Sequence, residues 1–373
     1  MSSTVKVIVG LVVVAVVAVV AYVLVGQDKQ SGEEKVLNVY NWSDYIAEDT
    51  IANFEKETGI KVNYDVFDSN EVLEAKLLAG NTGYDIVVPT GSFLERQIKA
   101  GVFAELDQNK LPNAVNLDPT ILSQVAKNDP GNKHAIPYMW GTTGIGYNTA
   151  MVKERLGDVP INSWDPIFDP DTIAKLADCG VTLLDSPAEV FPAAVNYLGL
   201  DPTAKREEDL AKAEELLLKV RPSIKYFHSS QNINDLANGD ICVAMGWSGD
   251  MLIARDRAAE ADAGVEVEYL IPKEGALMWF DLMAIPAGAP HPNNAHAFLN
   301  YILQPEVTAA ISNYVFYANA NAASIQFVDA DVKDDPAIYP PPETMMRLYV
   351  DPASSQEYDR ALTRAWTRVK TGQ

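Results

Sequence analysis

Apolar and polar positions near the start of the chain follow a pattern of short strands that alternate with helices. Strands are predicted at 36–40, 60–66 and 84–89, where apolar side chains alternate with polar ones or form a short continuous run. Helices with an apolar face are predicted at 47–58, 71–78 and 93–100. This order of elements predicts a parallel sheet with right-handed crossover connections.

A second stretch, residues 150–270, has the pattern of another α/β unit. Strands are predicted at 181–184 and 239–245, and helices at 207–220 and 251–261. Residues 137–148 and 276–286 lack a helical period, so we predict extended segments that cross between the two units. Further helices are predicted at 293–302, 306–313 and 355–369, and the last is expected to fold back on the second unit.

The first 26 residues differ from the rest of the chain. Residues 7–25 are uncharged and almost entirely apolar, and this run is long enough to cross a bilayer as a helix. A cleaved signal usually has a shorter apolar core and a clear small-residue cleavage site. We therefore predict either a signal peptide or an uncleaved amino-terminal membrane anchor at 1–26, followed by a polar linker at 27–35. Both alternatives predict export of the remainder.

The chain is acidic, with a net charge of −22. This charge argues against a nucleic-acid partner, because phosphate binding needs a basic surface. It is compatible with a cationic ligand, although solubility explains it equally well.

In an exported chain the two cysteines, Cys179 and Cys242, are predicted to form a disulfide, with two buried free thiols as the alternative. Their wide separation does not suit a metal site.

Tryptophan and aspartate occur together in three clusters that we predict at strand ends. The clusters are Trp42 with Asp44, Trp247 with Asp250, and Trp279 with Asp281. Ligands of open α/β sheets bind at the carboxyl ends of strands. Aromatic faces attract cations, and a carboxylate pairs with an ammonium group. Any single cluster could instead serve core packing and helix capping, but three of one composition favour a shared cleft for an alkylammonium ligand.

Small hydroxyl groups are predicted at the same rim of the sheet. Ser43 and Tyr45 flank the first aspartate, and the third strand ends at Thr90 and Ser92. A buried carboxylate without a partner is costly, so an empty cleft is expected to stay open. A cationic ligand would supply the missing partner and favour closure by hinge bending.

The sequence gives little support to an enzyme. Asp250 occupies the position of the final glycine in a nucleophile elbow at 246–250. No phosphate-cradling loop is present, and none of the four histidines belongs to a paired zinc motif. No glutamate lies near the strand-end clusters to complete the carboxylate pair of a glycosidase. We predict no catalytic residue, no metal site and no cofactor.

Seven stretches of sequence, in order along the chain, have a specific composition. They are YNWSDYI at 40–46, FEKETGIKV at 54–62, PYMW at 137–140, TTGIGYN at 142–148, YFHSSQ at 226–231, NDLANGDICVA at 234–244 and FYANAN at 316–321. Through these stretches the chain from about residue 36 to 373 resembles the periplasmic polyamine-binding proteins of ABC importers. The resemblance is closest to the putrescine-binding kind.

The resemblance implies a two-lobed α/β fold, the type II periplasmic binding protein fold. Its two parallel or mixed sheets are joined by crossing strands, and the ligand cleft lies between the lobes. Lobe I is expected at 36–138 and 280–325, and lobe II at 139–279 and 326–373. The family further implies a protein that is not an enzyme, and we expect a monomer. It would act in the periplasm, either free or held to the inner membrane by residues 7–25, and would deliver its ligand to an ABC permease in that membrane.

The resemblance also assigns residues to the cleft. The ligand-binding positions it implies are Trp42, Ser43, Asp44, Tyr45, Thr90, Ser92, Glu189, Trp247, Asp250, Trp279, Asp281 and Tyr317. Cys179 and Cys242 match a disulfide of the family.

Three positions depart from the pattern of putrescine binders. Thr90 stands where they have Ser, and Trp279 stands where they have Phe and spermidine binders have Trp. Ala188 stands where they have an acid, which puts the partner of the distal amine in doubt. We expect putrescine as the ligand, with spermidine or a longer or acylated polyamine as alternatives. A membrane-tethered polyamine sensor that acts through a partner is a further alternative, supported by the predicted anchor alone.

Overall fold

The computed structural model describes residues 33–373. The chain divides into two units, Met1–Lys35 and Val36–Gln373. The helices and strands of the described residues lie in the second unit. The signal or anchor predicted at 7–25 lies outside the described residues. Within residues 33–373, none of the helices combines the length and the apolar character needed to span a bilayer.

The predicted parallel sheet at the start of the second unit is confirmed. Strand β1 (Val36–Trp42) lies between β2 (Lys61–Phe67) and β3 (Ile86–Val87), and both pair with it in parallel. The connecting helices are α2 (Thr50–Thr58), α3 (Asn70–Ala79) and α4 (Gly91–Lys99). β3 is shorter than the predicted 84–89 because Pro89 has no N–H to donate, and the Val88 carbonyl accepts the indole N–H of Trp42.

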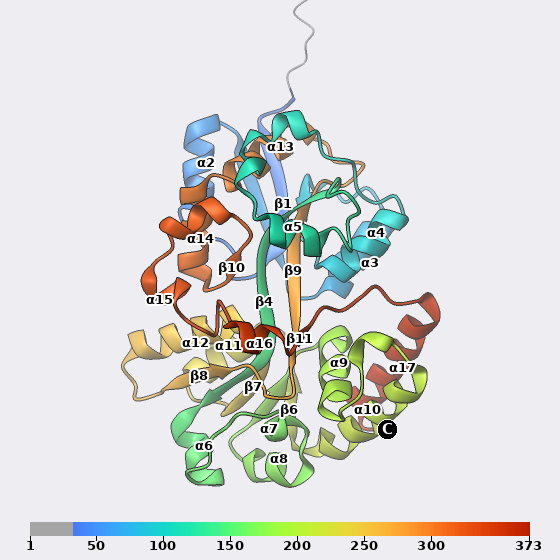
Figure 1. Cartoon of the computed structure of the whole chain (residues 1–373), viewed down its shortest axis with the longest axis vertical. Coiled ribbons are helices and arrows are strands. Elements are labelled where there is room, and N and C mark those ends of the chain that lie inside the picture. Colours follow the sequence, from blue (N-terminus) through green and yellow to red (C-terminus); the bar gives the residue numbers. More distant parts are fainter. Residues whose placement is uncertain (1–32) are drawn as a thin grey trace, which may run out of the picture. The chain divides into compact units, whose positions relative to one another are not determined.

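Two long antiparallel strands cross from one half of this unit to the other, as predicted (Figure 1). They are β4 (Ala135–Asn148) and β9 (Ala276–Ala284), and they pair along most of β9. β4 also pairs with β7 (Val243–Trp247) and β8 (Val267–Leu270). With β5 at Val181–Leu183 and β6 at Ile224–Phe227, the strand order is β2-β1-β3-β9-β4-β7-β5-β6. The two sheets form one hydrogen-bonded path because β4 belongs to both.

The second half of the path contains three parallel strands, β7, β5 (Val181–Leu183) and β6 (Ile224–Phe227). Its helices are α6 (Thr149–Leu156), α7 (Asp165–Phe168), α8 (Pro170–Leu176), α9 (Pro187–Tyr197), α10 (Glu207–Val220), α11 (Gln231–Ala237) and α12 (Ser248–Ala261). β7 begins four residues later than the predicted 239–245. The backbone N–H groups of Asp240 and Ile241 donate to the Asp235 carbonyl instead, which closes the end of α11.

The predicted disulfide between Cys179 and Cys242 is present. Cys179 follows α8 and Cys242 immediately precedes β7. The backbone N–H of Cys242 also donates to the Gly180 carbonyl, so the two segments are held by a covalent bond and a hydrogen bond.

The remaining helices complete both halves. They are α5 (Pro119–Val125), α13 (Pro292–Ile302), α14 (Pro305–Val315), α15 (Ala330–Lys333), α16 (Pro342–Met345) and α17 (Gln356–Thr371). Two short strands, β10 (Ala318–Asn319) and β11 (Leu348–Tyr349), pair with β4 and β9 respectively. Single 3₁₀ turns lie at Gln108–Lys110, Pro112–Asn116, Pro202–Ala204, Arg221–Ser223 and Ala322–Gln326. Helix α17 packs on α9 and α10, as predicted (Figure 1).

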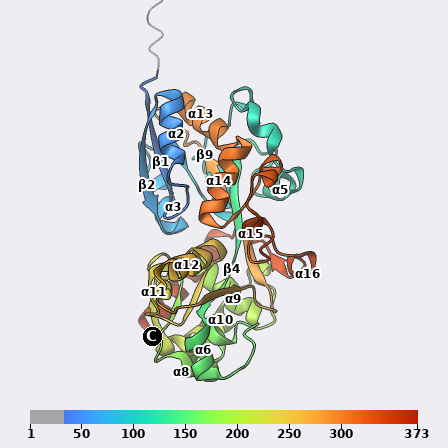
Figure 2. The ribbon, with the colours of Figure 1, turned by 90° about the vertical axis from the view of Figure 1, so that its left-hand side faces the viewer.

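The buried apolar side chains gather in separate clusters. One draws on residues 37–140 and 277–338, together with Leu252. A second draws on 145–245 and 358–369, and a third on 233–267. We call the half around the first cluster the first lobe and the half around the other two the second lobe; Figure 2 shows them from the side. The residue bounds predicted for lobes I and II stay a prediction.

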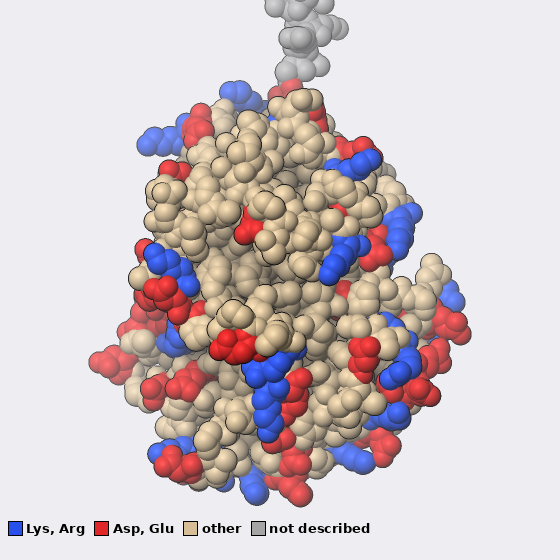
Figure 3. Space-filling model, in the orientation of Figure 1, with Lys and Arg blue, Asp and Glu red and all other residues tan. Residues whose placement is uncertain are grey.

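Acidic and basic side chains are interspersed over the face drawn in Figure 3. Neither sign of charge covers this face alone, so the excess of acidic residues does not produce one broad negative patch there. Such a mixed surface favours solubility rather than attraction of one extended polycation.

Candidate ligand-binding site

A cavity lies between the two lobes, beside the crossing strands. It is lined by Trp42, Ser43, Tyr45, Asn70, Thr90, Glu189, Trp247, Asp250, Trp279, Asp281 and Tyr317. Ten of these residues are in the set predicted from the sequence, and Asn70 is not. The residues come from β1, α3, β7, α9, α12 and β9 and from the turns beside them, so the fold brings distant parts of the chain to one place.

Two tryptophans from opposite lobes meet at this cavity. Trp42 is the last residue of β1 and Trp247 is the last residue of β7. Their ring centroids are 5.3 Å apart with the planes at 75°. The indole N–H of Trp42 donates to the Val88 carbonyl at 2.9 Å, which fixes its ring. Both positions follow the rule that the carboxyl ends of strands form the site.

Asp281 lies in the middle of β9, opposite Met139 of β4. The prediction that the Trp279–Asp281 cluster marks a strand end is therefore wrong; the crossing strand itself passes through the site. The Thr90 hydroxyl donates to Asp281 Oδ1 at 2.6 Å, and the Tyr45 hydroxyl donates to Oδ2 at 3.0 Å. Burial raises the pKa of Asp281 to about 7, although both hydrogen bonds oppose the shift.

Asp250 lies in the first turn of α12, where the helix dipole favours a negative charge. The Tyr317 hydroxyl donates to Asp250 Oδ1 at 2.7 Å and accepts from the Asp250 backbone N–H at 3.1 Å. Burial raises the pKa of Asp250 to about 7, and the negative charges of Asp44 and Asp281 add to this shift. The hydrogen bond from Tyr317 and the more distant positive charge of Arg257 oppose it.

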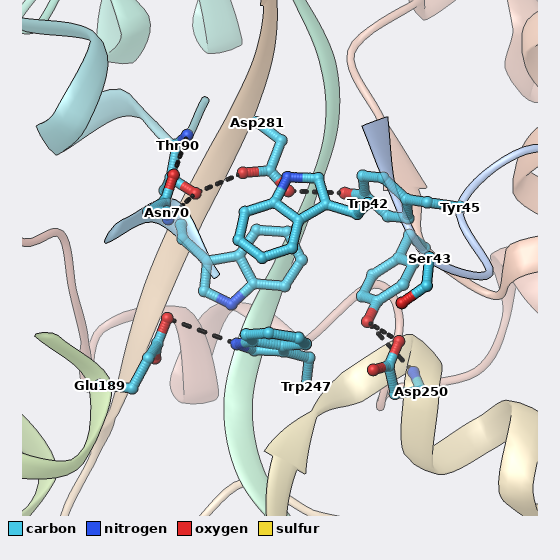
Figure 4. A pocket seen from close by; sticks show the side chains of 11 residues that line it. Trp42, Ser43, Tyr45, Asn70, Thr90, Glu189, Trp247, Asp250 and Asp281 are labelled. Atoms are coloured by element: carbon cyan, nitrogen blue, oxygen red, sulfur yellow. Dashed lines mark hydrogen bonds between the residues drawn. The ribbon is translucent and has the colours of Figure 1, made fainter. Parts of the chain in front are cut away.

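Glu189 lies in the first turn of α9. The Thr143 hydroxyl donates to its Oε2 at 2.6 Å, and the indole N–H of Trp247 donates to its Oε1 at 3.3 Å. Burial raises the pKa of Glu189 to about 7, and these two hydrogen bonds oppose the shift. Figure 4 shows Glu189 and Asp250 on opposite sides of Trp247, with Asp281 above it.

The three buried acids lack an ion-pair partner. Within residues 33–373, Glu189, Asp250 and Asp281 form no ion pair with a basic side chain. Buried charges without an opposite charge are expensive, and the raised pKa values express that cost. A ligand with ammonium groups would remove the cost, and the indole faces around the cavity suit its methylene groups.

Asn70 is the lining residue that the sequence prediction missed. It is the first residue of α3, and its side chain donates to the Thr90 hydroxyl at 2.9 Å and accepts from the Thr90 N–H at 3.1 Å. Asn70 thus orients the hydroxyl that Thr90 presents to Asp281. Its place just after the second strand was a usable signal, because that is where the other site residues lie.

Two predicted site residues lie outside this cavity. Asp44 has a positive φ of 53° and forms an ion pair with Arg257 of α12 at 2.7 Å, across the two lobes. Ser92 lies in the first turn of α4 and lines two neighbouring cavities instead. Ligand contacts by Asp44 and Ser92 stay predictions.

A metal centre has no basis in the described residues. Within 33–373, no three His, Cys, Asp or Glu side chains come together in a group that could hold a metal ion. The chemistry available in the cavity is therefore that of carboxylates, hydroxyls, one amide and aromatic rings.

Comparison with known proteins gives a consistent result. The family model described as bacterial extracellular solute-binding protein matches residues 49–340. The putrescine-binding periplasmic protein of Escherichia coli strain K12 is 58% identical over 344 residues, which cover 92% of this chain and 93% of the relative. The putrescine-binding periplasmic protein of Pseudomonas aeruginosa strain UCBPP-PA14 is 55% identical and covers 92% of this chain and 94% of its own length.

A solved structure has the same fold at lower identity. The spermidine/putrescine ABC transporter substrate-binding protein of Streptococcus pneumoniae superposes with a TM-score of 0.73 and 30% identity. The match covers 90% of this chain and 99% of that one.

Proposed function

Because the chain belongs to the bacterial extracellular solute-binding proteins, we propose that it captures putrescine or a related polyamine between its two lobes and delivers it to an ABC importer. The names of its relatives and the chemistry of the cavity support the same ligand class. The single observation that carries the proposal is the set of three buried carboxyl groups, Glu189, Asp250 and Asp281, which form no ion pair with any cation among residues 33–373.

The proposed mechanism is binding coupled to closure. In an open form the three carboxyl groups would be hydrated and ionised. A diamine that enters between the lobes replaces that water with ammonium groups, and closure then buries neutralised pairs rather than bare charges. The indole rings of Trp42, Trp247 and Trp279 cover the alkyl chain, and Thr90, Tyr45 and Tyr317 hold the carboxylates in place. The ligand thus favours the closed form through its differential contacts.

The proposal includes a location and a partner. Two relatives are named as periplasmic proteins, so we propose that this protein acts in the periplasm and passes its ligand to a permease in the inner membrane. We further propose that it works as a monomer and without catalysis. Whether residues 7–25 tether it is tested by amino-terminal sequencing of the mature protein: a start near Gln27 means a released carrier.

Calorimetric titration with putrescine, spermidine, cadaverine, agmatine and a neutral sugar tests the ligand class. We expect saturable binding of one molecule of putrescine or of a longer polyamine and no heat with the sugar. Absence of heat with all four amines would overturn the polyamine assignment, and binding of the sugar alone would replace it.

A further inference from the structure

A groove lies on the face of the crossing strands that points away from the first cavity. Trp279 and Asp281 of β9 line the cavity. Met278 and Phe280 line the groove instead, because successive side chains of a strand point to opposite faces. Trp140 of β4 pairs with Phe280 and also lines the groove. Figure 2 shows α5 and α16 on one side of β4 and α3 on the other. The same two strands thus form the floor of both spaces.

The walls of the groove come from both lobes. Ile121 of α5 and Lys127, just after α5, belong to the first lobe. Thr203 lies in a 3₁₀ turn that packs on α9 of the second lobe. If the lobes separate at the first cavity, the crossing strands act as the hinge, and the groove behind them narrows. A molecule that fits the groove of this structure would therefore favour the closed form.

The floor and the rim of the groove are largely apolar. Trp140 and Phe280 are buried, and their ring centroids lie 6.3 Å apart. Met278 lies beside them, and the exposed Met345 of α16 lies at the rim. Unbranched methionine side chains adapt to the shape of a guest, and aromatic rings pack against other rings. This lining suits a small molecule with an aromatic body.

One cation at the groove has no acidic partner. Lys127 donates a hydrogen bond to Gln124 at 2.7 Å, and within residues 33–373 it forms no ion pair. The two acids that line the groove already have partners. Glu95 pairs with a lysine of α4 at 2.6 Å, and Asp351 pairs with Lys205. The groove is thus the electrostatic opposite of the first cavity, because here a negative group on the ligand would supply the missing partner.

We propose that this groove is a second binding site, for a small aromatic acid. The ring would lie against Trp140 and Phe280, and the carboxylate would pair with Lys127. Occupation of the groove and of the first cavity would strengthen each other, because both favour the same closed arrangement of the lobes. The groove itself does not depend on the proposed function, but its coupling to the first cavity rests on it.

The test uses the fluorescent aromatic sulfonate 1-anilinonaphthalene-8-sulfonate as a probe on the mature protein. We expect one probe molecule to bind, and saturating putrescine should tighten that binding at least ~5-fold, the lower end of typical allosteric coupling. By reciprocity, saturating probe should tighten putrescine binding by the same factor in calorimetry. A probe that had entered the first cavity would instead be displaced by putrescine.

Two variants locate the probe. Lys127→Gln should weaken probe binding roughly 2- to 5-fold, the range for an exposed ion pair, and should leave putrescine affinity unchanged in the absence of probe. Met345→Glu adds a negative charge at the rim and should weaken the probe further. Lys175→Gln is the matched control, because Lys175 is an exposed lysine of α8 that forms no ion pair within the described chain.

Three results would overturn the proposal. They are displacement of the probe by putrescine, a probe affinity that putrescine leaves unchanged, and equal probe binding by Lys127→Gln and Lys175→Gln. If the parent protein binds putrescine and gives any of these results, the groove proposal alone fails. If the parent binds no amine, the proposed function fails, and the dependence of probe binding on Lys127 decides the groove separately.

Discussion

Each carboxyl group in the cavity is held by neighbours that donate hydrogen bonds but bring no positive charge. Asp281 accepts from Thr90 and Tyr45, Asp250 from Tyr317, and Glu189 from Thr143 and Trp247. Hydroxyl and indole donors fix the position of a carboxylate while leaving its charge uncompensated. At the residue scale the site is therefore shaped for a ligand that brings the positive charge.

Replacing Asp281 with Asn tests whether the ligand needs the negative charge of this side chain. The Asp281→Asn variant keeps the size of the side chain but removes the charge, so putrescine binding is expected to weaken by at least ~1.5 kcal/mol. Calorimetry on the variant measures the loss, and a thermal melt checks that it folds. Asp158→Asn, an exposed aspartate paired with Lys153, is the control. Unchanged affinity in Asp281→Asn would remove this residue from the site.

The raised pKa values of Glu189, Asp250 and Asp281, each about 7, predict how affinity depends on pH. Below pH 7 protons on these buried carboxyl groups stabilise the ligand-free closed form, which competes with the open, ionised form that takes up the ligand. Affinity for putrescine should therefore rise as the pH increases from about 5.5 to about 8, and binding near pH 6.5 should release protons. Titrations in buffers of different ionisation enthalpy measure that release. A flat affinity profile with no proton release would show that these groups are already ionised.

The predicted strands explain which residues of the site could be located from the sequence. Trp42 and Trp247 end β1 and β7. The alternating pattern before Trp42 and the buried strand predicted before Trp247 placed both residues at strand ends. Asp281 is different: it lies in the middle of the predicted crossing segment and not at a strand end, and local periodicity does not show which residues of that segment face the site. The ion pair of Asp44 with Arg257 joins residues 213 positions apart, so the sequence pattern gave no indication of it. Periodicity alone does not assign Asp44 and Asp281 to a ligand site, whereas the resemblance to the polyamine-binding proteins does.

The disulfide acts at the level of elements, because it ties the end of α8 to the start of β7. It closes a loop of 63 residues, which in the chain-entropy model is worth roughly 4 kcal/mol. A double variant, Cys179→Ser with Cys242→Ser, should lose about that much free energy of unfolding in a urea titration. Neither residue lines the cavity, so putrescine affinity should persist where the variant is folded. Equal stability of variant and parent would contradict this role.

For the whole molecule, the sequence patterns and the resemblance predict both the fold and the family. The crossing strands confirm the fold, and the relatives confirm the family. One close contact between the lobes lies beside the site. Gly249 of α12 faces Tyr317 of the first lobe, and a Cβ on Gly249 would lie 2.3 Å from the tyrosine ring. Because Gly249 and Tyr317 belong to different lobes, separation of the lobes would break this contact.

Gly249→Ala therefore tests closure separately from the chemistry of the site. The added methyl group should hold the lobes apart or displace Tyr317 from Asp250, and putrescine affinity should fall at least ~10-fold, as expected when a hydrogen bond to a charged group is lost. Circular dichroism should show an unchanged fold, because each lobe keeps its own core. Gly288→Ala, where a Cβ would meet nothing within 4 Å, is the matched control. If Gly249→Ala binds as tightly as Gly288→Ala, the closed contact is not required for binding.

A crystal structure of this protein grown with putrescine would show directly whether the three buried acids hold an alkylammonium ligand. We expect one diamine enclosed by Trp42, Trp247 and Trp279, with its ammonium groups about 2.8 Å from carboxylate oxygens among Glu189, Asp250 and Asp281. A diamine bound on the outer surface, or a closed cavity that excludes the ligand while these three acids remain unpaired, would contradict it.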